Sequence, residues 1–343
     1  MNWSPTPEIA PTMAVPLNRI DELLAAFRSR SVLVIGDLML DEFMWGKVSR
    51  ISPEAPVPVV EVQRSSSYPG GAANVARNLC AFARATTVAG VVGKDEAGER
   101  LLNLLTEEHV GIQGVIKSSD RPTTLKTRII ARQQQVVRVD RESRAPLSDG
   151  VKQEVLAELG RILPEYDAVI VEDYAKGLIN QDIASFVISE CNRLGKTITI
   201  DPNPTNPLDW SNATAIKPNR SEAFLAAGIP AAEGLPAMLR AGEILRAKWR
   251  TDFLLITLGE EGILLLQDGI APYHTPTRAQ EVYDVSGAGD TAIAFFTLAL
   301  ASGATGIEAA EIANHAAGVV VGKLGTATLT PEELRESFVQ HNA

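Results

Sequence analysis

The segment Asp284-Val-Ser-Gly-Ala-Gly-Asp290 combines small residues with two acids, directly before an apolar stretch. Glycine permits tight turns and a close approach of the backbone to a ligand. If a helix starts here, the free N–H groups of Gly287, Ala288 and Gly289 form an anion hole, which the helix dipole supports. Such a hole suits the negative charge of a phosphate during its transfer.

Asp290 would repel a phosphate at this place unless its task is to accept the proton of the attacking hydroxyl. An anion hole beside a general base is what phosphorylation of an alcohol requires. The alternative is that Asp290 is an ordinary helix N-cap. The acid six residues earlier and the apolar helix behind favour the catalytic interpretation. The segment is neither a Walker P-loop, which would carry a lysine, nor a dinucleotide-binding turn after the first strand.

Two distant motifs resemble the signatures of the ribokinase-like (PfkB) sugar kinases. The segment 284–291 resembles the carboxyl-terminal signature, and Tyr68-Pro-Gly-Gly-Ala-Ala-Asn74-Val-Ala-Arg-Asn78 resembles the amino-terminal one. The resemblance covers residues 31–335 and implies an ATP-dependent carbohydrate kinase with Asp290 as its base. It also implies that the sugar is held by Asp37, Gly70, Gly71 and Asn74. Taken alone, the amino-terminal motif would be a glycine turn before a helix.

Further motifs of the resemblance face the nucleotide. Asn219-Arg-Ser-Glu222 follows a predicted strand, and in similar kinases such a motif lies near the phosphates and Mg²⁺. Carboxylate and amide oxygens suit a hard cation that keeps its waters, although the motif is also a helix-capping pattern. The implied ATP contacts are Asn219, Arg220, Ser221, Glu222, Thr257, Gly259, Gly262, Asn314 and Gly318. Glu222 is the implied Mg²⁺ ligand through water, and Asp284 the implied site of a monovalent cation, with K⁺ as the candidate.

Other stretches resemble the branch of this family that phosphorylates heptose 7-phosphates. They are residues 50–60, Glu172-Asp-Tyr-Ala-Lys176, residues 133–140 and the tail 325–334. The resemblance implies ATP-dependent phosphorylation of the C1 hydroxyl of D-glycero-β-D-manno-heptose 7-phosphate, a step in ADP-heptose synthesis for the lipopolysaccharide core. In some bacteria this kinase is fused to an adenylyltransferase, and because the sequence ends after the kinase region, that step is expected on another protein.

A phosphorylated sugar requires cations near its phosphate. Lys176 and Arg138 are the first candidates, with Lys126 and Arg128 nearby, unless these residues only form surface salt bridges. Two alternatives remain open. The chain could be another PfkB-type kinase for a sugar, a sugar phosphate or a nucleoside. It could also be an inactive regulator that binds a sugar or a nucleotide.

The site needs a scaffold, and apolar strands alternate with amphipathic helices along the chain. Strands are predicted at residues 31–35, 86–92, 168–172, 197–201, 213–216 and 253–258, and helices at 17–29, 72–82, 96–108, 150–162, 181–193, 220–227, 234–247, 288–301 and 305–321. This alternation predicts an α/β fold with a mostly parallel sheet covered on both faces. The resemblance specifies a ribokinase-like three-layer sandwich.

Two β-rich segments interrupt this rhythm, and we expect them to form a small β-sheet lid over the ligand edge. They are residues 42–63 and 114–140. The apolar residues Pro56, Val57, Val59 and Val60 require cover, so we expect a homodimer through the lid. Residues 1–16 are predicted to be a disordered arm, and residues 17–335 a single kinase domain.

Composition excludes several classes of function. The net charge of −10 argues against a nucleic-acid binder. Cys80 and Cys191 are far apart and are expected to be buried thiols in a reducing compartment. The longest apolar stretch, residues 291–301, is too short to span a bilayer, and residues 1–16 lack the features of a signal peptide. The sequence therefore predicts a cytoplasmic protein without a membrane partner.

Overall fold

The computed structural model describes residues 10, 14–131, 134–323 and 325–342. Residues 1–9 and 11–13 of the predicted arm lie outside the described residues. The central sheet has nine strands in the order β13-β12-β11-β10-β9-β8-β1-β4-β5. Only the pairs β11–β12 and β12–β13 are antiparallel among these strands, so the predicted mostly parallel sheet is confirmed.

The strands of this sheet are short and follow the apolar runs of the sequence. Their bounds are β1 (Ser31–Gly36), β4 (Ala85–Gly93), β5 (Gly111–Ser118), β8 (Ala168–Glu172), β9 (Thr197–Asp201), β10 (Ala215–Ile216), β11 (Phe253–Thr257), β12 (Ile263–Gln267) and β13 (Tyr273–Thr275). A strand buried on both faces is apolar throughout rather than alternating, and β1, which is buried along its whole length, meets this rule.

Helices cover both faces of the sheet and make two cores. The helices are α1 (Leu17–Phe27), α2 (Ala72–Leu79), α3 (Glu96–Glu107), α4 (Asp149–Ile162), α5 (Gln181–Arg193), α6 (Arg220–Ala227), α7 (Leu235–Trp249), α8 (Ala288–Ala301), α9 (Gly306–Val321) and α10 (Pro331–Asn342). Val32 and Val34 of β1 join a core with α1, α2, α3, α8, α9 and α10. Leu33 and Ile35 join the opposite core with α4, α5, α6 and α7. Successive side chains of a strand point to opposite faces, so one strand serves both cores.

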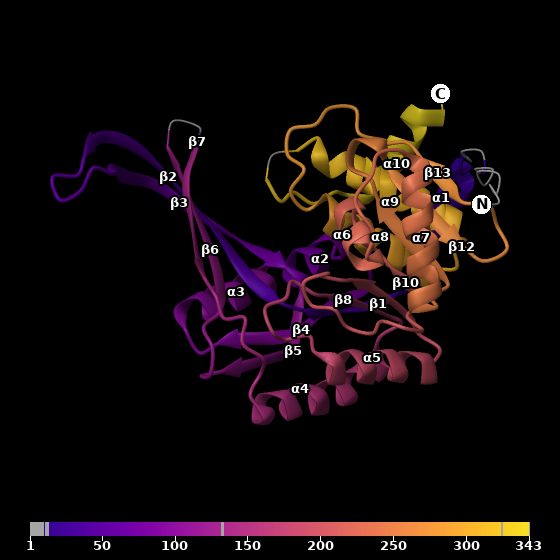
Figure 1. The fold of residues 1–343 in the computed structure, drawn as a ribbon, viewed down its shortest axis with the longest axis horizontal. Helices are drawn as coiled ribbons and strands as arrows, with labels where there is room; N and C mark the ends of the chain where they lie inside the picture. Colours follow the sequence, from indigo (N-terminus) through magenta and orange to yellow (C-terminus); the bar gives the residue numbers. More distant parts are fainter. Residues whose placement is uncertain (1–9, 11–13, 132–133, 324, 343) are drawn as a thin grey trace.

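A second sheet extends from one side of this body (Figure 1). Its strands are β2 (Leu38–Ile51), β3 (Pro58–Gly71), β6 (Thr124–Ala131) and β7 (Gln134–Arg141), in the order β3-β2-β6-β7. We call these four strands the lid sheet. The predicted small second sheet is therefore present, and its strands continue directly from β1 and into α2.

Several predicted boundaries differ from the structure, and one helix was not predicted. The first lid segment was predicted at residues 42–63, but β2 and β3 cover residues 38–51 and 58–71. Residues 114–118 were assigned to the lid, but they belong to β5, which pairs with β4 at the edge of the central sheet. An edge strand is only partly buried, so β5 lacks the continuous apolar run that identifies an inner strand. A third helix, α10, follows the two predicted closing helices, and its Leu334 and Phe338 are buried in the core. Within the described residues, no helix is both long enough and apolar enough to cross a membrane.

Candidate active site

The carboxyl ends of five neighbouring parallel strands supply polar side chains at one edge of the sheet. β8 ends at Glu172, β9 at Asp201 and β11 at Thr257, while Asp37 follows β1 and Lys217 follows β10. Because the strands are parallel and adjacent, their ends meet along this edge, where open α/β sheets bind ligands.

Asp290 lies in the first turn of α8 and faces this edge. Its Oδ2 accepts a hydrogen bond from Asn74 Nδ2 at 2.7 Å, and its Oδ1 accepts one from the Tyr174 hydroxyl at 2.9 Å. Burial raises the pKa of Asp290 to about 6, against the effect of these two hydrogen bonds. Asp290 is therefore an oriented carboxylate that is ionised at neutral pH and able to take a proton.

The helix α8 begins at Ala288, as the sequence predicts, whereas the anion hole at its start stays a prediction. Gly287 is the N-cap of α8 with φ of +85°, a conformation that suits glycine. A Cβ at Gly287 would lie 3.1 Å from Asn74 Nδ2, and one at Gly289 would lie 3.5 Å from Lys217 Nζ. The Ala288 N–H is turned toward the carbonyl of Val285 at 3.3 Å. The glycines thus keep space between the start of α8 and two polar side chains.

A cluster of buried acids surrounds Lys217. One oxygen each of Glu172, Asp201 and Asp290 lies within 4.8 Å of the others. Lys217 Nζ lies 2.7 Å from Asp201 Oδ2. Both Glu172 oxygens are buried without a hydrogen-bond partner among the described residues, and burial, followed by the charge of Asp201, raises the pKa of Glu172 well above its ordinary value.

Sequence reasoning missed the chemical importance of Glu172, Tyr174, Asp201 and Lys217. Glu172 and Asp201 could have been selected as candidate site residues, because both were predicted as the last residues of apolar strands. The same argument that selected Asp37 at the end of β1 would have selected them. Tyr174 carries no comparable signal, since its hydroxyl meets Asp290 only through the fold.

Asp37, predicted to bind the sugar, is buried and holds a loop. Its Oδ2 accepts hydrogen bonds from the backbone N–H groups of Tyr174 and Lys176, both at 3.0 Å, and its Oδ1 accepts one from Leu178 at 3.3 Å. A buried carboxylate requires such donors. Asp37 therefore fixes the segment that carries Tyr174, and its contact with a sugar stays a prediction.

Gly70 and Gly71, also predicted at the sugar, allow close packing where β3 enters α2. A Cβ at Gly70 would lie 2.0 Å from Asp41 Oδ2, and Asp41 in turn forms an ion pair with Arg128 at 2.5 Å. Gly71 has φ of +60°, and its Cβ would lie 2.5 Å from the Asp37 carbonyl oxygen. This turn places Asn74, in the first turn of α2, against Asp290.

The cations predicted for a substrate phosphate are only partly brought together. Lys176 Nζ lies 2.7 Å from Glu142, and both side chains are largely buried. Lys126 Nζ lies 3.9 Å from Asp140, and its pKa is lowered first by burial and then by the charge of Lys176. Arg138 instead pairs with Asp140 at 2.9 Å on β7, where its side chain is half exposed. Lys176 and Lys126 thus form one basic group, with Arg138 further out on the lid sheet.

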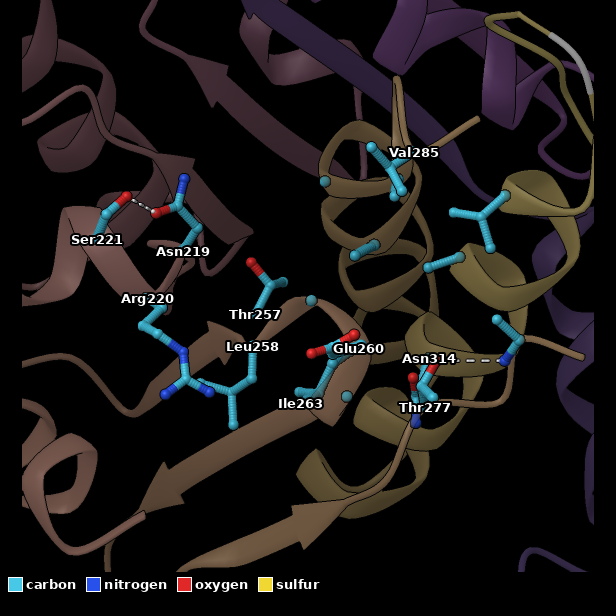
Figure 2. A pocket seen from close by; sticks show the side chains of 18 of the residues that line it. Asn219, Arg220, Ser221, Thr257, Leu258, Glu260, Ile263, Thr277, Val285 and Asn314 are labelled. Atoms are coloured by element: carbon cyan, nitrogen blue, oxygen red, sulfur yellow. Dashed lines mark hydrogen bonds between the residues drawn. The ribbon is translucent and has the colours of Figure 1, made fainter. Parts of the chain in front are cut away.

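A cavity of about 960 Å³ opens beside the start of α8 (Figure 2). It is large enough for a nucleotide. Asn219 and Arg220 lie on one side of it, and Asn314 and Thr277 on the other. The predicted ATP residues that line it are Asn219, Arg220, Ser221, Thr257, Gly259, Gly262, Asn314 and Gly318.

Glu222, the remaining predicted ATP residue, lines a second cavity of about 300 Å³ together with Asp290. Asn219 Oδ1 accepts from the Glu222 N–H at 3.0 Å, and Glu222 Oε2 accepts from the Asn219 N–H at 2.8 Å, so the two form a capping box. The capping pattern noted in the sequence is therefore present, and it leaves Glu222 at the cavity wall. Glu172 and Asp201 line the same cavity.

The carboxylates that line this smaller cavity, among them Glu172, Asp201 and Glu222, fit Mg²⁺. The ion prefers carboxylate oxygens and water, and Glu172 contributes two buried oxygens without a partner among the described residues. Asp284, the predicted monovalent-cation residue, accepts a hydrogen bond from the Ser286 N–H at 2.9 Å. That contact closes a local turn and does not itself define a cation site.

Comparisons with known proteins agree with this geometry. Residues 29–333 match the family described as pfkB family carbohydrate kinase. The chain is 44% identical to "Bifunctional protein HldE" of Helicobacter hepaticus over 307 residues, which are 90% of this chain and 63% of that protein. It is 43% identical to the protein of the same name in Geobacter metallireducens, over 94% of this chain and 66% of that protein. The chain thus spans less than two thirds of the length of these curated relatives.

Solved structures resemble the fold. Arabidopsis thaliana ribokinase, complexed with ribose and ATP, has a TM-score of 0.71 at 18% identity, over 90% of this chain and 99% of that one. Phosphofructokinase-2 from Escherichia coli, in a tetrameric inhibited form, has a TM-score of 0.74 at 16% identity, over 92% of this chain and 100% of that one. At such identities the likeness concerns the fold alone, and it confirms the predicted ribokinase-like architecture.

Proposed function

Because the chain belongs to the pfkB family of carbohydrate kinases, we propose that it transfers the terminal phosphate of ATP to the C1 hydroxyl of D-glycero-β-D-manno-heptose 7-phosphate. The product is the 1,7-bisphosphate, a precursor of ADP-heptose. The observation that carries the phosphotransfer is Asp290, held by Asn74 and Tyr174 where the start of α8 meets two cavities. The heptose follows from the sequence motifs and from the identity of 44% to an HldE protein.

The reaction is a direct in-line transfer. Asp290 accepts the proton of the C1 hydroxyl, while the N–H groups of Gly287 and Gly289 hold the transferred phosphate. The Ala288 N–H joins them only when it releases the Val285 carbonyl. Asn74 and Tyr174 orient the Asp290 carboxylate and keep it ionised. The lid sheet excludes water that would otherwise hydrolyse ATP. Positioning and electrostatics suffice, so no covalent enzyme intermediate is required.

Cations complete the site. Glu222, with Asp201 and Glu172 nearby, would hold Mg²⁺ through water, and the ion would supply neutralisation of phosphate charge. Asp284 would be the residue that holds a monovalent cation such as K⁺. Lys176 and Lys126 receive the 7-phosphate, and Arg138 reaches it from the lid sheet. The charge pairs with Glu142 and Asp140 support this assignment, because they keep the cations ordered before the phosphate arrives.

The proposal includes a homodimer through the lid sheet and a location in the cytoplasm, where ATP is available. Support for the dimer comes from large exposed apolar side chains on the lid sheet. These are Ile51, Val62, Tyr68, Val136, Val137 and Val139, together with Val57 in the turn between β2 and β3. Exposed apolar patches of this kind mark association surfaces.

Product analysis tests the reaction. The protein is incubated with Mg²⁺, ATP and heptose 7-phosphate, and phosphorus NMR follows the products. We expect ADP and a sugar with a second phosphate at C1. A clear preference for fructose 6-phosphate, ribose or adenosine in the same assay would replace the heptose assignment with another sugar or nucleoside kinase. If no acceptor leads to release of ADP, the kinase assignment would be wrong, and the chain would instead be an inactive regulator that binds a sugar or a nucleotide.

Asp290→Asn supplies the matched inactive variant. The amide has the shape of the carboxylate but cannot take a proton, so we expect turnover to fall by about 10²- to 10⁴-fold. Calorimetry should show nucleotide affinity within a few-fold of the parent protein, since Asp290 does not line the larger cavity. Near-normal turnover of this variant would contradict the assignment of the base.

A further inference from the structure

We propose that the Lys217 ammonium binds the phosphoryl group during its transfer and is thus a second catalytic residue beside Asp290. The inference rests on the proposed kinase reaction, but not on the identity of the sugar. It starts from the place where the two cavities meet. Both are lined by Asn219, Thr257 and Gly289. A phosphate that leaves a nucleotide in the larger cavity for a hydroxyl at Asp290 must pass this shared wall.

Lys217 faces that wall. A Cβ at Gly289 would lie 3.5 Å from Lys217 Nζ. Because glycine has no side chain, nothing at this position separates the ammonium from the backbone of the predicted anion hole. Lys217 lines the smaller cavity together with Asp290 and is only 4% exposed. Its position is fixed by Asp201, 2.7 Å away at the end of the neighbouring strand β9.

The electrostatics of the smaller cavity require a cation for a phosphate to enter. Five acids line it, namely Glu172, Asp173, Asp201, Glu222 and Asp290. Among the described residues that line this cavity, Lys217 is the one with a positively charged side chain. An ammonium has three N–H donors, and the Asp201 carboxylate accepts a hydrogen bond from this one. The remaining donor capacity suits the equatorial oxygens of the transferred group.

A contribution to the stability of the fold does not by itself explain why the ion pair of Lys217 and Asp201 is buried. A buried ion pair gains little over apolar residues of similar size, because both charges lose their hydration. The Asp201 carboxylate, 2.7 Å from Lys217 Nζ, favours the charged form of this amine. A charged, fixed and buried donor at the path of the phosphate is the arrangement that stabilises transition-state charge.

The chemistry balances without a change at Lys217. The bond between the γ-phosphorus and the ADP oxygen breaks, and a bond from the C1 oxygen to that phosphorus forms. The hydroxyl proton goes to Asp290. Lys217 keeps its protons throughout and donates hydrogen bonds to the non-bridging oxygens.

Lys217→Met tests the inference through binding as well as rate. We expect kcat to fall by about 10²- to 10³-fold, as for loss of one oxyanion donor. By calorimetry, affinity for a non-hydrolysable ATP analogue should fall by about 10-fold or more, the size of a charge-assisted hydrogen bond. Affinity for ADP, which lacks the γ-phosphate, should stay within a few-fold. Equal losses for both nucleotides would overturn the inference.

A double variant separates catalysis from charge balance and protects against misfolding. Lys217→Met with Asp201→Asn removes the ion pair without leaving a lone buried charge. If Lys217 only neutralised Asp201, this variant would recover affinity for the ATP analogue relative to Lys217→Met, and the inference would be wrong. We expect no recovery, whereas Lys217→Arg should regain part of it. A parent protein that binds neither nucleotide would instead contradict the proposed function.

Discussion

Asp290 illustrates how neighbours set the chemistry of one carboxyl group. Burial alone favours the protonated form, and the hydrogen bonds from Asn74 and Tyr174 pull the pKa back to about 6. A base must be deprotonated to act, and the best base has a pKa near the working pH. The two donors thus make a buried acid usable as a base at neutral pH.

The pH dependence of the rate should report this balance. Below about pH 6 Asp290 is protonated, so we expect kcat/KM to rise with pH through that range and to level off above it. Tyr174→Phe removes one hydrogen bond to the carboxylate, which raises the pKa of Asp290, and the acid limb should move to higher pH. Rate profiles of the two proteins measured side by side decide this. A limb that stays in place or moves to lower pH argues against Asp290 as the titrating base.

Glu172 makes a prediction about stability. Its pKa is raised well above the ordinary value, so folding favours its protonated form. The protonated carboxyl group of Glu172 is compatible with the fold, so the protein keeps its full stability below the pKa of the unfolded state. Ionisation of the buried group costs free energy, so stability is lost as the pH rises through the folded pKa. Glu172→Gln cannot ionise. Without Mg²⁺, we expect it to raise the free energy of unfolding at pH 8.5 by about 1–3 kcal/mol, with little change at pH 4. Urea unfolding at both pH values measures this, and an equal effect at both would exclude ionisation as the cause.

At the level of elements, the start of α8 depends on a glycine at the N-cap position, Gly287. Gly287 and Gly303 both have φ of +85° and flank the same helix. A Cβ at Gly287 would press on Asn74 Nδ2 at 3.1 Å, whereas one at Gly303 would meet nothing within 4 Å. The two positions thus share a positive φ and differ in their contact with the site.

Alanine at these two positions gives a matched pair. Each substitution should cost about 1–2 kcal/mol of stability, since alanine tolerates positive φ poorly. Only Gly287→Ala should also lower kcat, by roughly 10-fold or more, because a small displacement of reacting groups has a large effect on rate. Thermal unfolding and steady-state kinetics of both variants test this. If Gly303→Ala lowers kcat as much as Gly287→Ala does, the loss comes from strain in α8 rather than from the contact with Asn74.

The elements were largely predictable where burial gives a clear sequence pattern. Inner strands such as β1 and β8 are continuous apolar runs, and the apolar helix α8 follows its glycines directly. The edge strand β5 is only partly buried, so its sequence resembled the lid strands around it. Of the candidate site, the sequence indicated Asp290 and Asn74, which the structure brings together, while their roles stay predictions. The contact of Tyr174 with Asp290 depends on the order of the strands in the sheet, which one sequence does not reveal.

At the scale of the molecule, the lid sheet differs from the body. The central sheet is covered by helices on both faces, while all of β7, about half of β3 and the end of β2 are exposed. In Figure 1 the lid sheet projects away from the helices. Leu38, Met39 and Leu40 at the start of β2 are buried, but the exposed apolar side chains further out lack cover from the same chain. This is the physical reason to expect a second copy there.

Val139 provides the test of that association. It lies on β7 and is 52% exposed, so a carboxylate there should leave the folded chain intact but oppose burial in an interface. Ile270, 49% exposed between β12 and β13, is the matched control on the body. We expect sedimentation velocity to show a dimer for the parent protein and Ile270→Glu, and dissociation at least about 10-fold more favourable for Val139→Glu, the effect of about 1.4 kcal/mol. If the lid sheet also covers the sugar, as we propose, the same variant should raise KM for the sugar more than KM for ATP. A parent protein that is monomeric at micromolar concentration, or equal effects of the two variants, would remove the lid sheet from consideration as the interface.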